Sequence, residues 1–228
     1  MAAHTDSPIL TPPVICAVIL DYGEVLCHLP AMATIERLAA IFQMDPHTFM
    51  PIYLQSRAPY DRGDVLHSEY WQNFATQAGV IIGEDEVEQA RQLDLELWGQ
   101  INDAMVLWVQ QLRAAGFKTS ILSNMPADMA AHMRKTFPWL GHFDHHIFSG
   151  EVRSVKPEPA IYQHCIDALG VQPNEALFID DREINLESAR AAGIRTIRFQ
   201  SVEQLREDLE ALRFTILPGQ SEIRRGSL

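Results

Sequence analysis

Hydrophobic residues follow two alternating patterns along most of this chain. The first is a short, uninterrupted apolar run, which is typical of strands that are buried on both faces. It occurs at residues 14–20, 119–122, 176–179 and 196–199. The second has the period of an amphipathic helix and occurs at residues 105–114, 159–169 and 185–192. Strands that alternate with helices predict βαβ units, and therefore an α/β fold with a doubly wound parallel sheet.

The segment from residue 29 to residue 103 breaks this alternation. It contains no convincing strand run, and helix-period patterns occur at residues 32–42, 68–78 and 84–98. The stretch RAPYDRGD, residues 57–64, indicates a loop near its middle. We therefore expect a helical cap domain at residues 29–103, inserted into a Rossmann-like core made of residues 14–28 and 104–218. The two ends, residues 1–13 and 219–228, are expected to be flexible.

Composition and charge narrow the kinds of partner. The chain has 228 residues, of which 47% are hydrophobic, and this suits one core with a small inserted domain. Its net charge of -12 argues against nucleic acid as the main partner. A small phosphorylated substrate remains compatible with this charge, because a local pocket or a bound cation can be positive on an acidic protein.

Location is indicated by the cysteines and by the early apolar run. The cysteines are Cys16, Cys27 and Cys165, and their scattered spacing suggests a reducing compartment. The run at residues 14–20 is too short to cross a bilayer, and no basic leader precedes it. We therefore expect a cytoplasmic protein with neither a membrane anchor nor a signal peptide.

Chemically useful side chains stand close to the ends of the predicted strands and the starts of helices. In chain order they are Asp21, Ser123, Asn124, Lys156, Asp180 and Asp181. In open α/β sheets, ligands bind outside the carboxyl ends of the strands, so these side chains are expected to meet at one edge. Crowded carboxylates need a cation, and Mg²⁺ prefers oxygen ligands. A carboxylate can also act as a nucleophile, while a lysine and a hydroxyl hold the transferring group.

Four segments carry a resemblance to a known family. VILDYGEVL, ILSNMP, VRSVKPEPAIY and LFIDDREINLESARAAGI resemble, in order, the four motifs of the haloacid dehalogenase (HAD) superfamily. The resemblance covers residues 14–200 and is greatest to the branch with a helical cap after the first motif. That branch includes small phosphatases, haloacid dehalogenases and the amino-terminal phosphatase domain of soluble epoxide hydrolase. The resemblance implies a Mg²⁺-dependent hydrolase that acts on a small phosphorylated metabolite through an aspartyl phosphate.

The resemblance also implies a role for each motif residue. Asp21 is implied as the nucleophile that becomes phosphorylated. Ser123, with Asn124 beside it, is implied to bind the phosphoryl group, and Lys156 is implied to stabilise the charge on the nucleophile and on the phosphoryl oxygens. The implied metal ligands are Asp21, the backbone carbonyl of Gly23, Asp180 and Asp181, with Asn185 ordering the last loop.

The first motif departs from the usual phosphatase pattern, in which a second Asp follows two residues after the nucleophile and exchanges protons with the leaving group and water. Here that position is Gly23. Three interpretations remain open. In the first, a phosphatase uses Glu24, a cap residue or the substrate itself in place of the Asp. The others are a 2-haloacid dehalogenase, whose halide needs no proton, and a catalytically weak or inactive protein that binds a phosphorylated ligand. Asp180 and Asp181 favour the phosphatase, because haloacid dehalogenases lack this acidic pair.

Other polar features have both a functional and a structural interpretation. Arg62 could bind a substrate carboxylate or phosphate, or it could form a surface ion pair with Asp61 or Asp64. The histidine-rich stretch HFDHH at residues 142–146 contains metal-binding residue types, but its order matches no zinc-enzyme helix motif, so we favour a structural role. Cys27 is interpreted as a small buried filler. The chain is expected to be a monomer or a homodimer.

Overall fold

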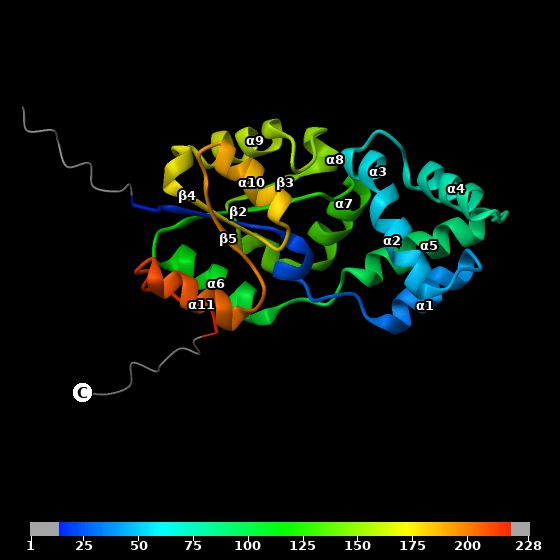
Figure 1. The fold of residues 1–228 in the computed structure, drawn as a ribbon, viewed down its shortest axis with the longest axis horizontal. Coiled ribbons are helices and arrows are strands. Elements are labelled where there is room, and N and C mark those ends of the chain that lie inside the picture. The colour runs from blue at the N-terminus through cyan, green and yellow to red at the C-terminus, as the bar shows by residue number, and fades with distance from the viewer. Residues whose placement is uncertain (1–13, 220–228) are drawn as a thin grey trace, which may run out of the picture.

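The computed structural model describes residues 14–219 and contains a five-stranded sheet with the strand order β3-β2-β1-β4-β5 (Figure 1). The strands are β1 (Ala17–Leu20), β2 (Lys118–Ser123), β3 (His145–Phe148), β4 (Ala176–Asp180) and β5 (Arg195–Arg198). Every neighbouring pair in this order is parallel. The carboxyl ends of the strands therefore lie at one edge of the sheet, and the predicted α/β fold with a doubly wound parallel sheet is confirmed.

Helices cover both faces of the sheet. They are α6 (Asp103–Ala114), α7 (Ala127–Thr136), α8 (Ser149–Val152), α9 (Pro159–Leu169), α10 (Glu183–Ala191) and α11 (Val202–Ala211). Figure 1 shows α9 and α10 on one side of the sheet and α6 and α11 on the other. Ala17 and Ile19 of β1 belong to the hydrophobic cluster under α9 and α10, whereas Val18 and Leu20 belong to the cluster under α6 and α11. Since both faces of β1 are covered, its sequence is apolar without alternation.

Between β1 and α6 the chain forms a separate group of helices. They are α1 (Met32–Ile41), α2 (Pro46–Ser56), α3 (Ala58–Arg62), α4 (His67–Ala78) and α5 (Glu84–Leu97). These helices enclose a hydrophobic cluster of their own, distinct from the two clusters of the sheet and rich in aromatic rings. Phe42 stacks on Trp71 with ring centroids 5.5 Å apart, and both side chains are fully buried or nearly so. The inserted segment is therefore a second layer with its own core.

Two chain segments connect this helical layer to the sheet, and they run beside each other. Cys27 and Ile101 form an antiparallel bridge, and the backbone N–H of His28 donates to the carbonyl of Gln100 (2.7 Å). From this connection we propose that the domain boundaries are those expected from the sequence. The cap is then residues 29–103, and the core is the two segments that flank it.

The expectation of a loop at residues 57–64 is wrong, because Ala58–Arg62 form the short helix α3. Pro59 lies in the first turn, where its missing N–H costs no hydrogen bond, and Gly63 ends the helix with a φ of 82°. The proline and the glycine that indicate a break are here the start and the end of a short helix.

The described residues also bear on the terminal and membrane expectations. None of the helices in the described part of the chain is both long enough and apolar enough to span a membrane. The ends expected to be flexible, residues 1–13 and 219–228, lie outside the described residues, apart from Gly219. Helices α2, α7, α8 and α11 are additional to the helices that the sequence pattern predicts.

Candidate active site

Asp21 stands directly after β1, at the edge where the strands end. Its backbone N–H still donates to a carbonyl of β4 (2.9 Å), so the residue continues the line of the strand. The next residues, Tyr22–Leu26, form a π-helical turn with extended backbone at Gly23 and left-handed backbone at Glu24. The Asp21 carboxylate accepts a hydrogen bond from the N–H of Tyr22 (2.6 Å) and is largely buried. The strand and the turn therefore hold this carboxylate in one place.

Lys156 bridges two of the acidic residues. Its Nζ lies 2.7 Å from Asp21 Oδ1 and 2.7 Å from Asp180 Oδ2, and all three side chains are at most 9% exposed. Burying a carboxylate without a partner is costly, so the shared ammonium is what stabilises the pair in this position. The loop before α9 thus delivers the cation that the sequence places far from both acids.

Asp180 is the last residue of β4 and Asp181 follows it, and Asp180 is held from several sides. The Asp180 carboxylate is fully buried and accepts hydrogen bonds from Asn185 Nδ2 (3.0 Å to each oxygen) and from the N–H of Arg182 (2.8 Å). Asn185 lies in the first turn of α10, so the start of this helix orders the Asp180 side chain. Asp181 is only partly buried.

Asp21, Asp180 and Asp181 can direct carboxylate oxygens to one point. One oxygen from each lies within 4.8 Å of the others, and within residues 14–219 no other group of three His, Cys, Asp or Glu side chains comes as close. A ligand set made only of carboxylates suits a hard divalent cation such as Mg²⁺. The single ammonium of Lys156 leaves this group of three carboxylates with excess negative charge, so the residues present fit such a cation.

The pKa values of these groups reflect burial and crowding. Burial raises the pKa of Asp21 to about 7, with Asp180 and Asp181 acting in the same direction and Lys156 opposing them. Burial, Asp180 and Glu24 raise the pKa of Asp181 to about 6. Burial lowers the pKa of Lys156, but the two contacting carboxylates raise it by more, so it stays protonated. Without a cation, the cluster therefore tends to hold a proton in its place.

Ser123 and Asn124 approach the same edge from β2. Ser123 is the last residue of that strand and is 4% exposed. The Asn124 side chain donates to the backbone carbonyl of Lys156 (2.9 Å) and accepts from its N–H (2.7 Å). Asn124 therefore holds the loop that carries Lys156, and a contact between Asn124 and substrate stays a prediction.

Trp98, the residue after α5, lies next to Gly23. A Cβ on Gly23 would lie 3.6 Å from Trp98 Cζ3. The Tyr22 hydroxyl donates to the Trp98 carbonyl, and Trp98 Nε1 donates to the Tyr53 hydroxyl (2.9 Å). Sequence reasoning gave Trp98 no role, since its local pattern indicates only the end of a helix. Only the folded cap brings it beside the turn that follows Asp21.

Glu24 is exposed and has a φ of 58°, which is unusual for a residue with a side chain. It lines an open hollow of about 340 Å³ together with residues that include His28 and Glu203. Its negative charge contributes to the raised pKa of Asp181, which indicates that it lies near the carboxylate group. A role of Glu24 in substrate binding or proton transfer stays a prediction.

Arg62 pairs with a residue of the core. Its guanidinium lies 2.6 Å from Glu158 Oε1 and 3.5 Å from Asp64 Oδ2, and about a third of the side chain is exposed. Asp61 pairs instead with Arg57 inside the cap (3.1 Å). Arg62 thus stands at the contact between cap and core, and substrate binding by it stays a prediction.

The HFDHH stretch and Cys27 have structural contacts. Asp144 pairs with Arg113 (3.0 Å), and His146 Nε2 lies 3.0 Å from the carbonyl of Leu140. Cys27 is fully buried, and burial raises the pKa of its thiol to about 12. These contacts agree with the structural interpretation of both features.

Comparison with known sequences identifies the family. The sequence model of the haloacid dehalogenase-like hydrolases matches residues 17–193, which is most of the chain. The chain belongs to the haloacid dehalogenase-like hydrolases. The resemblance carried by its four motif segments is thereby confirmed, and this HAD-like hydrolase is an enzyme of a known fold.

Curated relatives of this HAD-like hydrolase differ in their activities. Bifunctional epoxide hydrolase 2 of Rattus norvegicus is 35% identical over 124 residues, which are 52% of this chain and 22% of that protein. (S)-2-haloacid dehalogenase 1 of Pseudomonas sp. (strain CBS-3) is 32% identical over 96 residues, which are 42% of each chain. The matched part of the chain spans about a fifth of the first relative and less than half of the second.

A solved structure matches over more of the chain. The HAD family enzyme of Bacteroides thetaiotaomicron, in complex with magnesium and inorganic phosphate, superposes with a TM-score of 0.66 at 26% identity. The match covers 82% of this chain and 94% of that chain. The two proteins therefore share the fold over most of the length of each chain.

Proposed function

We propose that this HAD-like hydrolase is a Mg²⁺-dependent phosphatase that acts on a small phosphorylated metabolite through Asp21. The observation that carries the proposal is the meeting of Asp21, Asp180 and Asp181 within 4.8 Å, beside an ammonium that contacts two of them. The Bacteroides relative of similar fold, crystallised with magnesium and phosphate, supports the same ligand chemistry here.

The residues that would hold the cation are the three aspartates, with the backbone carbonyl of Gly23 as a further oxygen ligand. The cation would offset negative charge on the phosphoryl oxygens and on the attacking carboxylate. Tyr22 N–H and Lys156 Nζ both contact Asp21 Oδ1, so Oδ2 is the oxygen that we assign to the attack.

The proposed reaction has two displacements at phosphorus. Asp21 Oδ2 forms a bond to phosphorus while the bond to the leaving-group oxygen breaks, and that oxygen departs with the electron pair. Water then attacks the phosphorus, the bond to Asp21 breaks, and the carboxylate is restored. One proton of this water stays on the phosphate product, and the other passes through solvent to the leaving-group anion. Lys156 and Ser123 hold the phosphoryl oxygens in both steps, and the cap excludes bulk water during the first.

Gly23 limits the leaving group. With no acid at this position, the leaving oxygen receives no proton from residue 23, and a positioned acid typically contributes about 10²–10⁴-fold. Substrates whose leaving group is stable as an anion are therefore favoured. We propose aryl, acyl or sugar-1-phosphates over simple alkyl phosphates.

Two alternatives have observations behind them. A 2-haloacid dehalogenase is suggested by the Pseudomonas relative and by Gly23, since halide leaves without a proton. The acidic pair Asp180 and Asp181 opposes it, because halide displacement needs no metal. A weak or inactive protein that binds a phosphorylated ligand is suggested by Gly23 alone.

A substrate panel with and without Mg²⁺ separates these functions. We expect the wild type to hydrolyse aryl and acyl phosphates only with Mg²⁺, and Asp21→Asn to reduce kcat by at least about 10³-fold, because the nucleophile is removed. Release of chloride from 2-chloropropionate in the presence of EDTA would show a dehalogenase instead. Binding of Mg²⁺ and inorganic phosphate without turnover would show a binding protein.

A further inference from the structure

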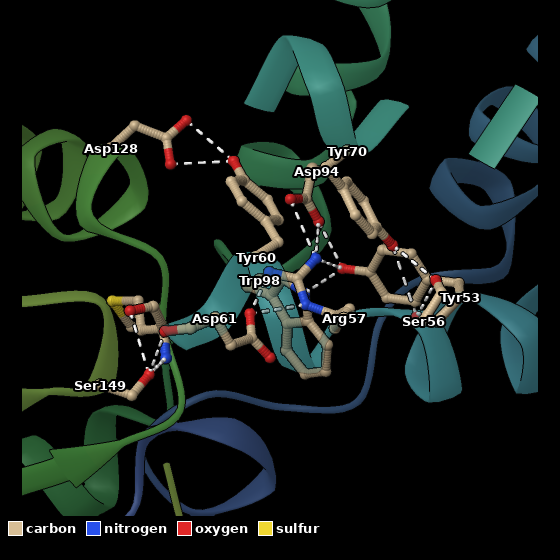
Figure 2. A network of polar contacts seen from close by, with 11 residues as sticks. Tyr53, Ser56, Arg57, Tyr60, Asp61, Tyr70, Asp94, Trp98, Asp128 and Ser149 are labelled. Carbon is tan, nitrogen blue, oxygen red and sulfur yellow. Dashed lines mark hydrogen bonds and ion pairs between the residues drawn. The ribbon is translucent and has the colours of Figure 1, made fainter. Parts of the chain in front are cut away.

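Ser149 lies between the cap and the core. It begins α8, directly after β3, and is fully buried. Its hydroxyl donates to the backbone carbonyl of Asp61 in the cap (2.5 Å) and accepts from the backbone N–H of Met125 in the core (2.8 Å). Figure 2 shows Ser149 beside Asp61, joined to it by a dashed line. One hydroxyl therefore joins the backbone of α3 to the loop that follows Ser123.

The cap end of this link is held by buried charges. The Asp61 carboxylate accepts from Arg57 Nε (3.1 Å), and the Arg57 guanidinium lies 2.9 Å from Asp94 Oδ1 on α5 (Figure 2). The Tyr60 hydroxyl reaches across to both oxygens of Asp128 on α7 (2.9 Å each). These contacts fix the position of α3 within the cap. The Asp61 carbonyl therefore moves together with the cap.

The helices on either side of the link approach each other backbone to backbone. A Cβ on Gly63 would lie 2.8 Å from the carbonyl oxygen of Gly150, and a Cβ on Gly150 would lie 2.6 Å from the N atom of Ala127. The N–H of Gly150 also donates to the carbonyl of Met125 (3.0 Å). Neither glycine position has room for a side chain, so α3, α8 and the loop after β2 are in close contact.

The core end of the link leads to the catalytic groups. Met125 follows Asn124, whose side chain makes two hydrogen bonds to the backbone of Lys156. The ammonium of Lys156 contacts Asp21. Displacement of the Met125 backbone would therefore move Ser123 and Asn124 directly, and Lys156 through Asn124.

The Ser149 hydroxyl has two possible acceptors. It has one hydrogen, which points to the Asp61 carbonyl when the cap is docked, and this directs a lone pair to the Met125 N–H. The other acceptor within reach is the carbonyl of Met125, at 3.4 Å. If α3 moved away, this carbonyl would be the remaining acceptor, and turning the hydrogen toward it would weaken the hydrogen bond from the Met125 N–H. The hydroxyl is thus an element with two arrangements, which coupling between two sites requires.

We propose that Ser149 is a positioning residue that couples docking of the cap to the geometry of the loop carrying Ser123 and Asn124. The loop with Ser123 and Asn124 would reach its catalytic geometry only while the cap encloses the substrate. The reacting groups would then be shielded from bulk water. The inference rests on the proposed phosphatase function, and it adds a residue outside the four motif segments given above.

The kinetic test compares two buried serines. Ser149→Ala removes both hydrogen bonds, whereas Ser120→Ala removes the fully buried hydroxyl that contacts the Ile121 carbonyl (3.1 Å) on β2. We expect Ser149→Ala to lower kcat for p-nitrophenyl phosphate about tenfold with KM within about twofold, because the loop acts mainly in the transition state. Ser120→Ala should leave both constants unchanged. Equal effects of the two variants, or a change confined to KM, would overturn the proposal.

A second test needs no turnover and leaves Ser149 in place. Gly63 and Gly79 both have positive φ (82° and 74°), so alanine strains the backbone at either, but only Gly63 has backbone within 3 Å of the added Cβ. We expect the Met125 amide to exchange its hydrogen about tenfold faster in Gly63→Ala, and at the wild-type rate in Gly79→Ala. Equal exchange rates of the Met125 amide in the two glycine variants would overturn the proposed coupling. This test stays decisive even if Ser149→Ala fails to fold. A wild type without phosphatase activity would instead refute the proposed function.

Discussion

At the residue scale, the resemblance to the superfamily implies an acid at the position of Gly23, and the structure has room for one. Its φ of -61° and ψ of 131° suit any residue. A Cβ there would meet Trp98 at 3.6 Å, an ordinary van der Waals contact. The missing carboxyl therefore reflects the sequence of the turn and not a lack of space.

We expect Gly23→Asp to increase kcat/KM for alkyl phosphates by roughly tenfold or more, because the new acid can protonate the leaving oxygen. The gain on aryl phosphates should be smaller, since these leaving groups need no proton. Gly23→Asn has the same shape without a transferable proton and serves as the control. Equal rates of the Asp and Asn variants on alkyl phosphates would show that proton donation at this position is not what limits the enzyme.

The sequence predicted which residues meet at the sheet edge, but not all that surrounds them. Asp21 and Asp180 could be placed because each ends an apolar run, and parallel strands bring such ends together. Lys156 could be placed because its motif stands before a helix of the same core. Trp98 and Ser149 could not be placed, because their contacts depend on how the cap meets the core, and no local pattern encodes that.

At the element scale, α3 contains a buried acid whose charge depends on pH. Burial raises the pKa of Asp61 from 3.8 to about 6, with Arg57 opposing and Asp94 adding to the increase. Between these two values the folded chain holds a proton that the unfolded chain releases. Lowering the pH through this window therefore increases the free energy of unfolding.

We expect Asp61→Asn to remove this contribution. Between pH 7 and pH 5, the free energy of unfolding of the variant should therefore rise by about 1 kcal/mol less than that of the wild type. Urea denaturation in EDTA measures it without interference from the metal site. Asp64→Asn replaces a partly exposed acid just beyond the same helix and serves as the matched control for an Asp-to-Asn change. The prediction is contradicted if Asp61→Asn and the wild type change in parallel.

Elements with a clear apolar pattern were predictable, and the short helix α3 was not. The strands β1, β2, β4 and β5 follow from uninterrupted apolar runs, and the long helices α4, α5 and α9 follow from apolar spacing over many residues. The short α3 does not, because Pro59 and Gly63 are residues that favour breaks as readily as helix ends. Only the packing of α3 against α8 shows that the two residues are the start and the end of a helix.

At the scale of the whole molecule, the order of strands and helices along the chain predicts the fold of the core. It does not predict where the cap lies on that core. The parallel sheet follows from strands that alternate with helices. The contacts that join cap to core, such as Tyr22 with Trp98 and Ser149 with Asp61, link residues 76 and 88 positions apart. Such contacts come from the docked surfaces of two layers, and single residues seldom reveal them in advance.

The central claim is that Asp21 attacks a phosphoryl group beside a divalent cation held by three aspartates. Acid quenching of the enzyme during turnover of an aryl phosphate, followed by mass spectrometry of its peptides, tests this most directly. The account predicts a phosphoryl group on the peptide that contains Asp21 when Mg²⁺ is present, and none with EDTA or in Asp21→Asn. Turnover that continues with EDTA, or that persists undiminished in Asp21→Asn, would contradict it.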